Sequence, residues 1–272
     1  MRRGCIWLSI FLIEPLLAQR VITRISGADW LFPADGFPAT AAPLSGSLGL
    51  DITVDPSGNY YLADPGNLMV MRVGSDGIIH VIAGNGVTGI NTLAFASGDG
   101  GLAVNAAVFQ PTAVAVDSSA NVYIAEYGSR VRKVTPEGII STFAGTGIDG
   151  FGGDGHPATQ AQLYAPFGLA IDSSNNLYIA DTNNNRIRKV TTDGIITTVA
   201  GNGQPGSTGD GGSARAATIY QPLRLAVDAA GNLFFVETTN PAIVPRLRKV
   251  DTHGNISTVA GGGLDLSDGI PA

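Results

Sequence analysis

The sequence of 272 residues has almost no cysteine, little histidine and no cluster of metal-binding side chains. Cys5 lies in the N-terminal segment that we expect to be removed, so the mature chain can form neither a disulfide nor a thiolate metal site. The three histidines occupy unrelated positions, whereas a zinc site needs several ligands about 2 Å from one ion. We therefore predict no metal and no other cofactor.

Charge and long helical segments are also scarce. Charged residues make up 14% of the chain, and its net charge is −6 at pH 7. Nucleic-acid binding needs a clustered positive surface, so this balance predicts no nucleic-acid partner. The 37 glycines and 15 prolines interrupt most windows, and none shows a sustained helical period. With 44% hydrophobic residues, the chain should still build a packed core.

Residues 1–18 have the pattern of a secretory signal peptide. Two arginines follow the initiating methionine, an apolar run extends from Ile6 to Ile13, and Ala18 offers a small residue for cleavage. The run is too short to cross a bilayer as a helix. We expect residues 19–272 to form a secreted, periplasmic or extracellular domain without a membrane span. The alternative is a mis-assigned start that adds meaningless residues.

One pattern occurs four times along the chain. Each copy has a Val/Ile-Asp pair, a strand ending in Asp or Glu, a third strand that is basic in three copies, and a last strand ending in Ala-Gly. Turn sequences such as Ser-Ser-Asn-Asn (173–176) and Thr-Thr-Asp-Gly (191–194) separate these strands. Four short antiparallel strands per copy predict an all-β propeller. Its four full blades are expected at residues 50–84, 111–145, 166–201 and 222–261.

The third copy carries a family resemblance. The stretches "PFGLAID" (166–172), "LYIAD" (177–181) and "NRIRKV" (185–190) resemble the NHL repeat. The linker "GDGHPATQAQLYAPFG" (153–168) is similar to the longer NHL variety of many secreted bacterial proteins and of the teneurin propeller. The resemblance covers about residues 20–272 and implies a propeller, usually of six blades. It identifies a scaffold that hosts many functions and does not name a ligand.

The two ends of the repeat predict an incomplete or open propeller. The stretch "VITRISG" (21–27) resembles an outer fourth strand, and "ADGFPATAAPL" (34–44) resembles a linker. The stretch "LSDGIPA" (266–272) resembles the start of another linker. The chain then corresponds to a truncated frame, a gene fragment or half of an assembly. Open blade edges of this kind favour self-association.

The repeated charges have a functional and a structural interpretation. The arginine pairs of the third strands could form a ring of cations for an anionic polymer, or could bond the acidic residues Glu126, Asp181 and Glu237 between blades. We favour the structural interpretation, because a motif present in most blades usually serves the blade. The aspartates of the Gly-Asp-Gly linkers are expected to cap short helical turns rather than to bind calcium. These aspartates are Asp99, Asp154 and Asp210.

Breaks in the repeat are the better candidates for a site. At the start of the innermost strand, Ala113 and Gly168 occupy two blades, but Asp51 and Arg224 occupy the other two. We predict that Asp51 and Arg224 face the mouth of the axial channel and bind a ligand. Two insertions, at 87–97 and 238–245, are further candidates, because binding usually occurs on loops of a rigid scaffold.

The sequence thus favours a non-catalytic scaffold that binds a protein or carbohydrate ligand. The first alternative is a lyase-like or lactonase-like enzyme working at the axial channel with Asp51 and Arg224. The second is a fragment without independent function. No catalytic residue is assigned, because no nucleophile-base pair or pair of carboxylates has local support.

Overall fold

The computed structural model describes residues 35–45, 50–87, 97–238 and 245–262. In this part of the chain four antiparallel sheets of one design follow each other, which confirms the predicted all-β propeller. The predicted signal peptide, the stretch 21–27 and the stretch 266–272 lie outside the described residues.

Each blade contains four strands in chain order. The first blade has β2 (Asp51–Val54), β3 (Tyr60–Asp64), β4 (Met69–Val73) and β5 (Ile78–Ala83). The second has β6 (Pro111–Val116), β7 (Val122–Glu126), β8 (Arg130–Val134) and β9 (Ile140–Ala144). The third has β10 (Pro166–Ile171), β11 (Leu177–Asp181), β12 (Arg186–Val190) and β13 (Ile196–Ala200). The fourth has β14 (Pro222–Val227), β15 (Leu233–Glu237), β16 (Arg246–Val250) and β17 (Ile256–Gly261).

The linkers contribute the remaining short elements. Strand β1 (Phe37–Pro38) pairs with β5 and makes the first sheet five-stranded. The linkers also contain short 3-10 helices, which are η1 (Ala39–Ala41), η2 (Ala103–Asn105) and η3 (Ala158–Gln160). A further 3-10 helix, η4 (Thr182–Asn184), joins β11 to β12 within the third blade. The segment around η1 lies along β5 as the later linkers lie along their own outer strands, because Gly36 donates to Ile79 as Gly155 donates to Ile196.

The turns form where the sequence predicts them. In the third blade the Asp172 carboxylate accepts the backbone N–H groups of Ser174 and Asn176, which closes the β10–β11 turn. Asn175 in that turn has φ 62°, a left-handed conformation that asparagine tolerates better than most residues. The β12–β13 turn ends at Gly194 with φ 83°, where a side chain would be strained. Side-chain chemistry in the turns therefore sets the register of each hairpin.

The core lies between blades rather than within one sheet. In the seam between the third and fourth blades, Tyr178 and Ile187 of one blade pack with Phe235 and Ile256 of the next, and linker residue Ile219 joins them. Complete burial of such side chains contributes roughly 1.5–3 kcal/mol each. Two similar clusters fill the other seams. Each blade is therefore stabilised mainly by its neighbours.

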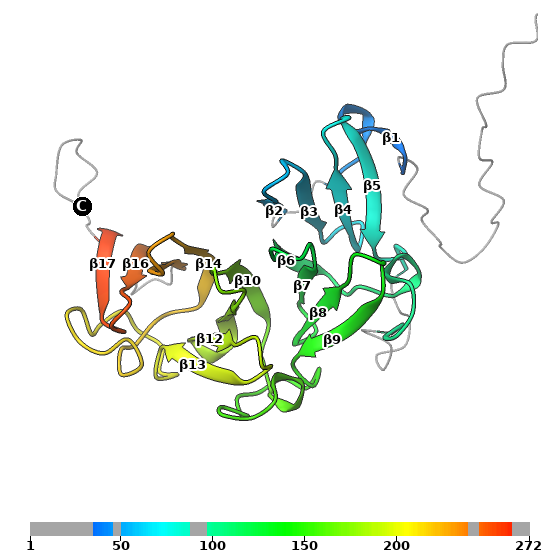
Figure 1. The fold of residues 1–272 in the computed structure, drawn as a ribbon. Helices are drawn as coiled ribbons and strands as arrows, with labels where there is room; N and C mark the ends of the chain where they lie inside the picture. Colours follow the sequence, from blue (N-terminus) through cyan, green and yellow to red (C-terminus); the bar gives the residue numbers. More distant parts are fainter. Residues whose placement is uncertain (1–34, 46–49, 88–96, 239–244, 263–272) are drawn as a thin grey trace, which may run out of the picture.

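The four blades form an arc that is not closed (Figure 1). The innermost strands β2, β6, β10 and β14 lie toward the centre of the arc, and the first and fourth blades form its ends. No strand pairing among the described residues joins the fourth sheet to the first. The expected open propeller is therefore observed.

Candidate functional site

The two predicted site residues meet at the axis. Asp51 lies at the start of β2 and Arg224 lies in β14, and the Asp51 Oδ1 to Arg224 Nη1 distance is 3.0 Å. Arg224 Nη1 also donates to the carbonyl oxygens of Thr112, at 2.9 Å, and Phe167, at 3.3 Å. These four residues come from four different blades. The axial cluster therefore connects the first and fourth blades across the centre of the arc.

The same contacts determine the electrostatics of the cluster. Burial raises the pKa of Asp51, while the Arg224 charge and the backbone N–H of Val114 oppose that rise. The Arg224 side chain retains 36% of its accessible surface, and that of Asp51 retains 19%. Asp51 and Arg224 therefore form an ion pair with each other and offset each other's charge. Ligand contact by either residue stays a prediction.

The small residue at the third-blade position has a direct packing reason. A Cβ atom on Gly168 would lie 1.9 Å from the carbonyl oxygen of Leu223 in the next inner strand. Real Cβ atoms do not approach backbone so closely. Inner strands β10 and β14 therefore approach each other at a distance that only glycine allows at this position.

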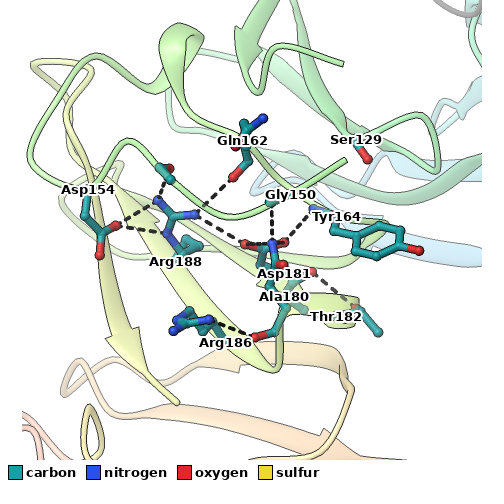
Figure 2. Close-up of polar contacts among 12 residues, drawn as sticks. Ser129, Gly150, Asp154, Gln162, Tyr164, Ala180, Asp181, Thr182, Arg186 and Arg188 are labelled. Carbon is teal, nitrogen blue, oxygen red and sulfur yellow. Dashed lines mark hydrogen bonds and ion pairs between the residues drawn. The ribbon is translucent and has the colours of Figure 1, made fainter. Parts of the chain in front are cut away.

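One arginine of each third-strand pair, namely Arg132, Arg188 or Arg248, is fully buried and makes structural contacts. Arg188 is fully buried and contacts both Asp154 Oδ1, at 2.8 Å, and Asp181 Oδ2, at 3.3 Å (Figure 2). It also donates to the carbonyl oxygens of Gln162, at 3.3 Å, and Gly152, at 3.1 Å. All these partners except Asp181 belong to the preceding linker. Arg188 therefore fastens the linker to the blade that follows it.

The same arrangement occurs in two other blades. Arg132 lies 2.5 Å from Asp99 and 3.6 Å from Glu126, and Arg248 lies 2.7 Å from Asp210 and 3.1 Å from Glu237. The predicted pairing of these arginines with the acidic strand ends is thus confirmed. The prediction for the linker aspartates is wrong, because the short helices after Asp99 and Asp154 have no side-chain cap. Those aspartates bind arginine instead, since a buried guanidinium requires a nearby anion.

In the second blade the buried Arg132 contacts two carboxylates whose pKa values shift in opposite directions. Burial raises the pKa of Asp99, but the Thr142 hydrogen bond and the Arg132 charge outweigh it, so this pKa lies below its usual value. Burial raises the pKa of Glu126 to about 8, and the Arg132 charge only partly offsets it. Burial likewise raises the pKa of Asp181 to about 6. The interactions of Asp99, the linker carboxylate, thus outweigh the effect of burial on its pKa. For Glu126, the carboxylate at the end of a strand, the effect of burial is larger than that of the Arg132 charge.

The first blade departs from this scheme. Met71 stands where the other blades have the buried arginine, and its side chain is fully buried. Asp64, the acidic residue that ends β3, remains buried without that arginine. Its carboxylate accepts hydrogen bonds from Asn67 Nδ2, at 2.8 Å, and from Ser45. Neutral donors therefore replace a cation in this blade.

Four large exposed apolar side chains lie on or beside the linker between the second and third blades. We call them the linker patch: Tyr127, Ile148, Phe151 and Tyr164, with exposed fractions of 47%, 64%, 42% and 39%. Tyr127 follows β7, and the other three belong to the linker that leads from β9 to β10. No feature of the repeat singled these residues out in the sequence.

Hydrogen bonds hold the segments of the linker patch together. Ser129 donates to Asp149 Oδ1 at 2.5 Å and accepts from the N–H of Ala165 at 3.4 Å. Asn184 Nδ2 donates to the carbonyl oxygen of Gly150 at 2.7 Å. The segments near residues 127, 150 and 164 are therefore linked by hydrogen bonds, and Figure 2 shows those made by Gly150 and by Tyr164.

A cation is part of the linker patch. The Arg186 guanidinium carbon lies 3.6 Å from the centre of the Phe151 ring, and Arg186 Nη2 donates to the Asn202 carbonyl oxygen at 2.8 Å. A guanidinium stacked on an aromatic face gains electrostatic attraction and keeps its edge available for polar contacts. The patch thus combines rigid aromatic surface with a positioned positive charge.

Two other features are absent from the described residues. Within this part of the chain no three His, Cys, Asp or Glu side chains gather closely enough to hold a metal ion. None of the helices formed by the described residues has the length and apolar character to cross a membrane.

Comparison with known proteins identifies the repeat. A family model described as the teneurin NHL domain matches residues 78–150 and 147–208. Teneurin-4 of Mus musculus is 33% identical over 233 residues, which cover 77% of this chain and 8% of that protein. The chain belongs to the NHL-repeat propeller family. This NHL propeller thus spans only a small part of the length of the curated relatives that it matches.

One solved structure supports the fold. A structural-genomics protein of unknown function from Bacteroides thetaiotaomicron matches this NHL propeller with a TM-score of 0.53 and 23% identity, covering 69% of this chain and 44% of the other. A structure of a streptogramin B lyase matches with a TM-score of 0.49 and 14% identity, covering 80% of this chain and 55% of the other. The first match supports the propeller architecture, and neither transfers an activity.

Proposed function

We propose that this chain is a secreted NHL-repeat module that binds a protein or carbohydrate ligand without transforming it. The observation that carries the proposal is the linker patch, in which Tyr127, Ile148, Phe151 and Tyr164 are exposed on a hydrogen-bonded scaffold. Soluble proteins rarely leave contiguous large apolar side chains exposed unless they bind something. Aromatic residues and arginine are also the types enriched at protein interfaces.

The distribution of charge supports binding through this patch rather than through the repeat. Arg132, Arg188 and Arg248 are fully buried, so they cannot reach an anionic polymer. At the axis, Arg224 contacts Asp51 and two carbonyl oxygens. The linker patch therefore offers both the exposed aromatic surface and, in Arg186, a positioned cation.

Rigidity favours this surface energetically. Binding costs free energy when loops and side chains lose freedom, and a surface held in advance avoids part of that cost. The hydrogen bonds from Ser129 and Asn184 fix the patch segments before any ligand arrives. A glycan or a protein segment could then stack on Phe151 and Tyr164 with little rearrangement.

The test compares ligand binding by matched variants. The purified chain is screened on a glycan array and against a set of extracellular proteins, and hits are repeated with Phe151→Ala plus Tyr164→Ala. We expect at least a tenfold loss of affinity, about 1.4 kcal/mol, because two aromatic contacts are removed. Tyr60→Ala, which removes an exposed tyrosine of the first blade, is the control and should bind normally. Equal binding by all variants would remove the patch from the proposal.

Two further measurements separate the remaining alternatives. Lactone hydrolysis and lyase activity that disappear in Arg224→Ala and Asp51→Asn would establish the enzyme at the axis and overturn non-catalytic binding. Secretion is tested by N-terminal sequencing of the exported protein, which should begin at Gln19. A chain retained with its first residues intact would contradict the secreted location.

A further inference from the structure

Phe151 and Ser207 occupy the same linker position in front of two successive blades. Each lies three residues before the linker aspartate that binds the buried arginine of its blade. The carbonyl oxygen of the next residue accepts a hydrogen bond from that arginine, at 3.1 Å in the third blade and 3.2 Å in the fourth. Phe151 lies between two blades that the structure describes, so a missing neighbour does not explain why it is 42% exposed.

Ser207 connects three charged side chains of the fourth blade. Its hydroxyl donates to Glu237 Oε2 and accepts hydrogen bonds from Arg248 Nη1, at 3.0 Å, and Arg246 Nη1, at 3.3 Å. Its carbonyl oxygen accepts a second bond from Arg246 Nη1, at 2.9 Å. One small polar residue therefore holds the acidic end of a strand and both arginines of the next strand.

Phe151 has no polar side-chain atom with which to make these bonds. In the third blade Asn184 Nδ2 donates to both carboxylate oxygens of Asp181, at 2.8 Å and 2.9 Å, so the acidic strand end is satisfied without a serine. The first arginine of the pair, Arg186, instead stacks on the Phe151 ring. A phenylalanine at this position thus leaves the blade intact and places a cation on an exposed aromatic side chain.

Arg186 keeps hydrogen-bonding capacity beyond its contacts with the described residues. It donates through Nη2 to the Asn202 carbonyl oxygen, at 2.8 Å, and through Nη1 to the Asn184 carbonyl oxygen, at 3.2 Å. A guanidinium has more N–H groups than these two bonds use. The acidic side chains of this blade's linker and strand end pair with Arg188 instead. Arg186 is therefore held in position by neutral acceptors and can bind an anion.

The surroundings of Arg186 favour a carboxylate that lies beside an apolar side chain. The planar fork of an arginine matches a carboxylate with two parallel hydrogen bonds. Ile148, three residues before Phe151 in the same linker, is 64% exposed and has no hydrogen-bonding side-chain group. Sugar hydroxyls covered by such a residue lose their water partners, whereas an apolar amino-acid side chain gains by leaving water. This composition favours a protein ligand over a carbohydrate.

We propose that Arg186, held on Phe151, recognises an acidic residue of a protein ligand whose neighbouring apolar side chain lies on the linker patch. The inference rests on the proposed function: it selects protein over carbohydrate and assigns Arg186 as the residue that determines specificity. A ligand with an amide in place of the carboxylate keeps its shape but loses the charge-assisted hydrogen bonds. The chain should therefore distinguish glutamate from glutamine in an otherwise identical ligand.

The test uses two sets of short synthetic peptides. In the first set a glutamate lies next to leucine, phenylalanine or tyrosine, and in the second set glutamine replaces that glutamate. Binding to the full chain is measured by fluorescence anisotropy. The best glutamate peptide should bind about tenfold more tightly than its glutamine counterpart, as expected for hydrogen bonds to a charged group. In Arg186→Gln this preference should disappear, while the glutamine peptide should bind as it does to the wild type.

The fourth blade supplies a matched control. Arg246→Gln removes the arginine at the equivalent strand position, which contacts Ser207 rather than an aromatic ring, and should leave the preference unchanged. Arg186→Lys keeps the charge without the planar fork and should retain only part of the preference. Circular dichroism checks that each variant is folded. If Arg186→Gln does not fold, Phe151→Leu replaces it and should reduce the preference, because the guanidinium loses the ring that holds it.

The outcomes separate this inference from the proposed function. Ligands that require Phe151 and Tyr164 but bind Arg186→Gln as well as the wild type would overturn the acidic ligand and leave the linker patch as a binding site. Failure of every glutamate peptide to bind would also overturn the inference, as would binding to acidic glycans alone. If the Phe151→Ala plus Tyr164→Ala variant binds all ligands like the wild type, the proposed function fails and this inference fails with it.

Discussion

Replacing Glu126 by glutamine should reduce the dependence of this chain's stability on pH. Glu126 is fully buried, and its Oε1 lies 3.6 Å from Arg132 Nη1, beyond hydrogen-bond distance. Asp99 approaches the same guanidinium to 2.5 Å and neutralises it. Glu126 is thus a second carboxylate on a cation that already has a partner, and glutamine removes its charge at nearly constant volume.

The size of the effect follows from the raised pKa. Burial moves the pKa of Glu126 from 4.5 to about 8, and a tenfold change in proton affinity is worth about 1.4 kcal/mol. The folded state therefore holds a proton that the unfolded chain has lost between about pH 4.5 and pH 8. Stability from this group is complete below that window and falls as pH rises through it, by about 5 kcal/mol at most. In the variant this fall is absent.

The assay is urea denaturation followed by circular dichroism between about pH 5 and pH 8.5. The free energy of unfolding of Glu126→Gln minus that of the wild type should rise steadily with pH. Asp181→Asn is the matched control: its pKa is raised by burial to about 6, so the difference that it causes should stop changing above about pH 6.5. A Glu126→Gln difference that stays constant with pH would refute the assignment of a buried, proton-holding carboxylate.

Two other expectations concern the axis and are measured by the same denaturation assay. Gly168→Ala should cost about 3 kcal/mol, because the added Cβ would lie 1.9 Å from the Leu223 carbonyl oxygen. Gly152→Ala, whose nearest contact would be 3.6 Å, should change little, and equal costs would contradict the close-approach explanation. A double-mutant cycle with Asp51→Asn and Arg224→Gln should give a coupling of about 1 kcal/mol that declines with added salt, as expected for a partly exposed pair. Zero coupling at low salt would show that the pair does not join the first and fourth blades.

The repeat made the architecture readable from the sequence because the causes of each blade are local. Strand alternation and turn residues such as Asp172 and Gly194 act within a few positions of themselves. Four copies of one pattern then confirm each other. The pairing of Arg188 with Asp181 was also predictable, because both residues lie on neighbouring strands of one hairpin.

Contacts between distant segments were not predictable in the same way. The sequence suggested that Asp154 caps a short helix, whereas it binds Arg188, 34 positions away, because the linker folds back along the blade that follows it. The linker patch was missed for a related reason. Tyr127 and Tyr164 look like ordinary hydrophobic residues of a repeat until packing shows that they remain exposed.

By itself the sequence determined the all-β class, the four blades and the open end of the ring, because periodic strands and turns encode them over short distances. It also selected Asp51 and Arg224 as the residues that break the pattern at the axis. Only the tertiary structure decided that these two pair with each other, since an arc of four blades brings β2 opposite β14. The same arc decides which apolar faces are buried in seams and which stay exposed, because burial depends on a neighbouring blade and not on the residue alone.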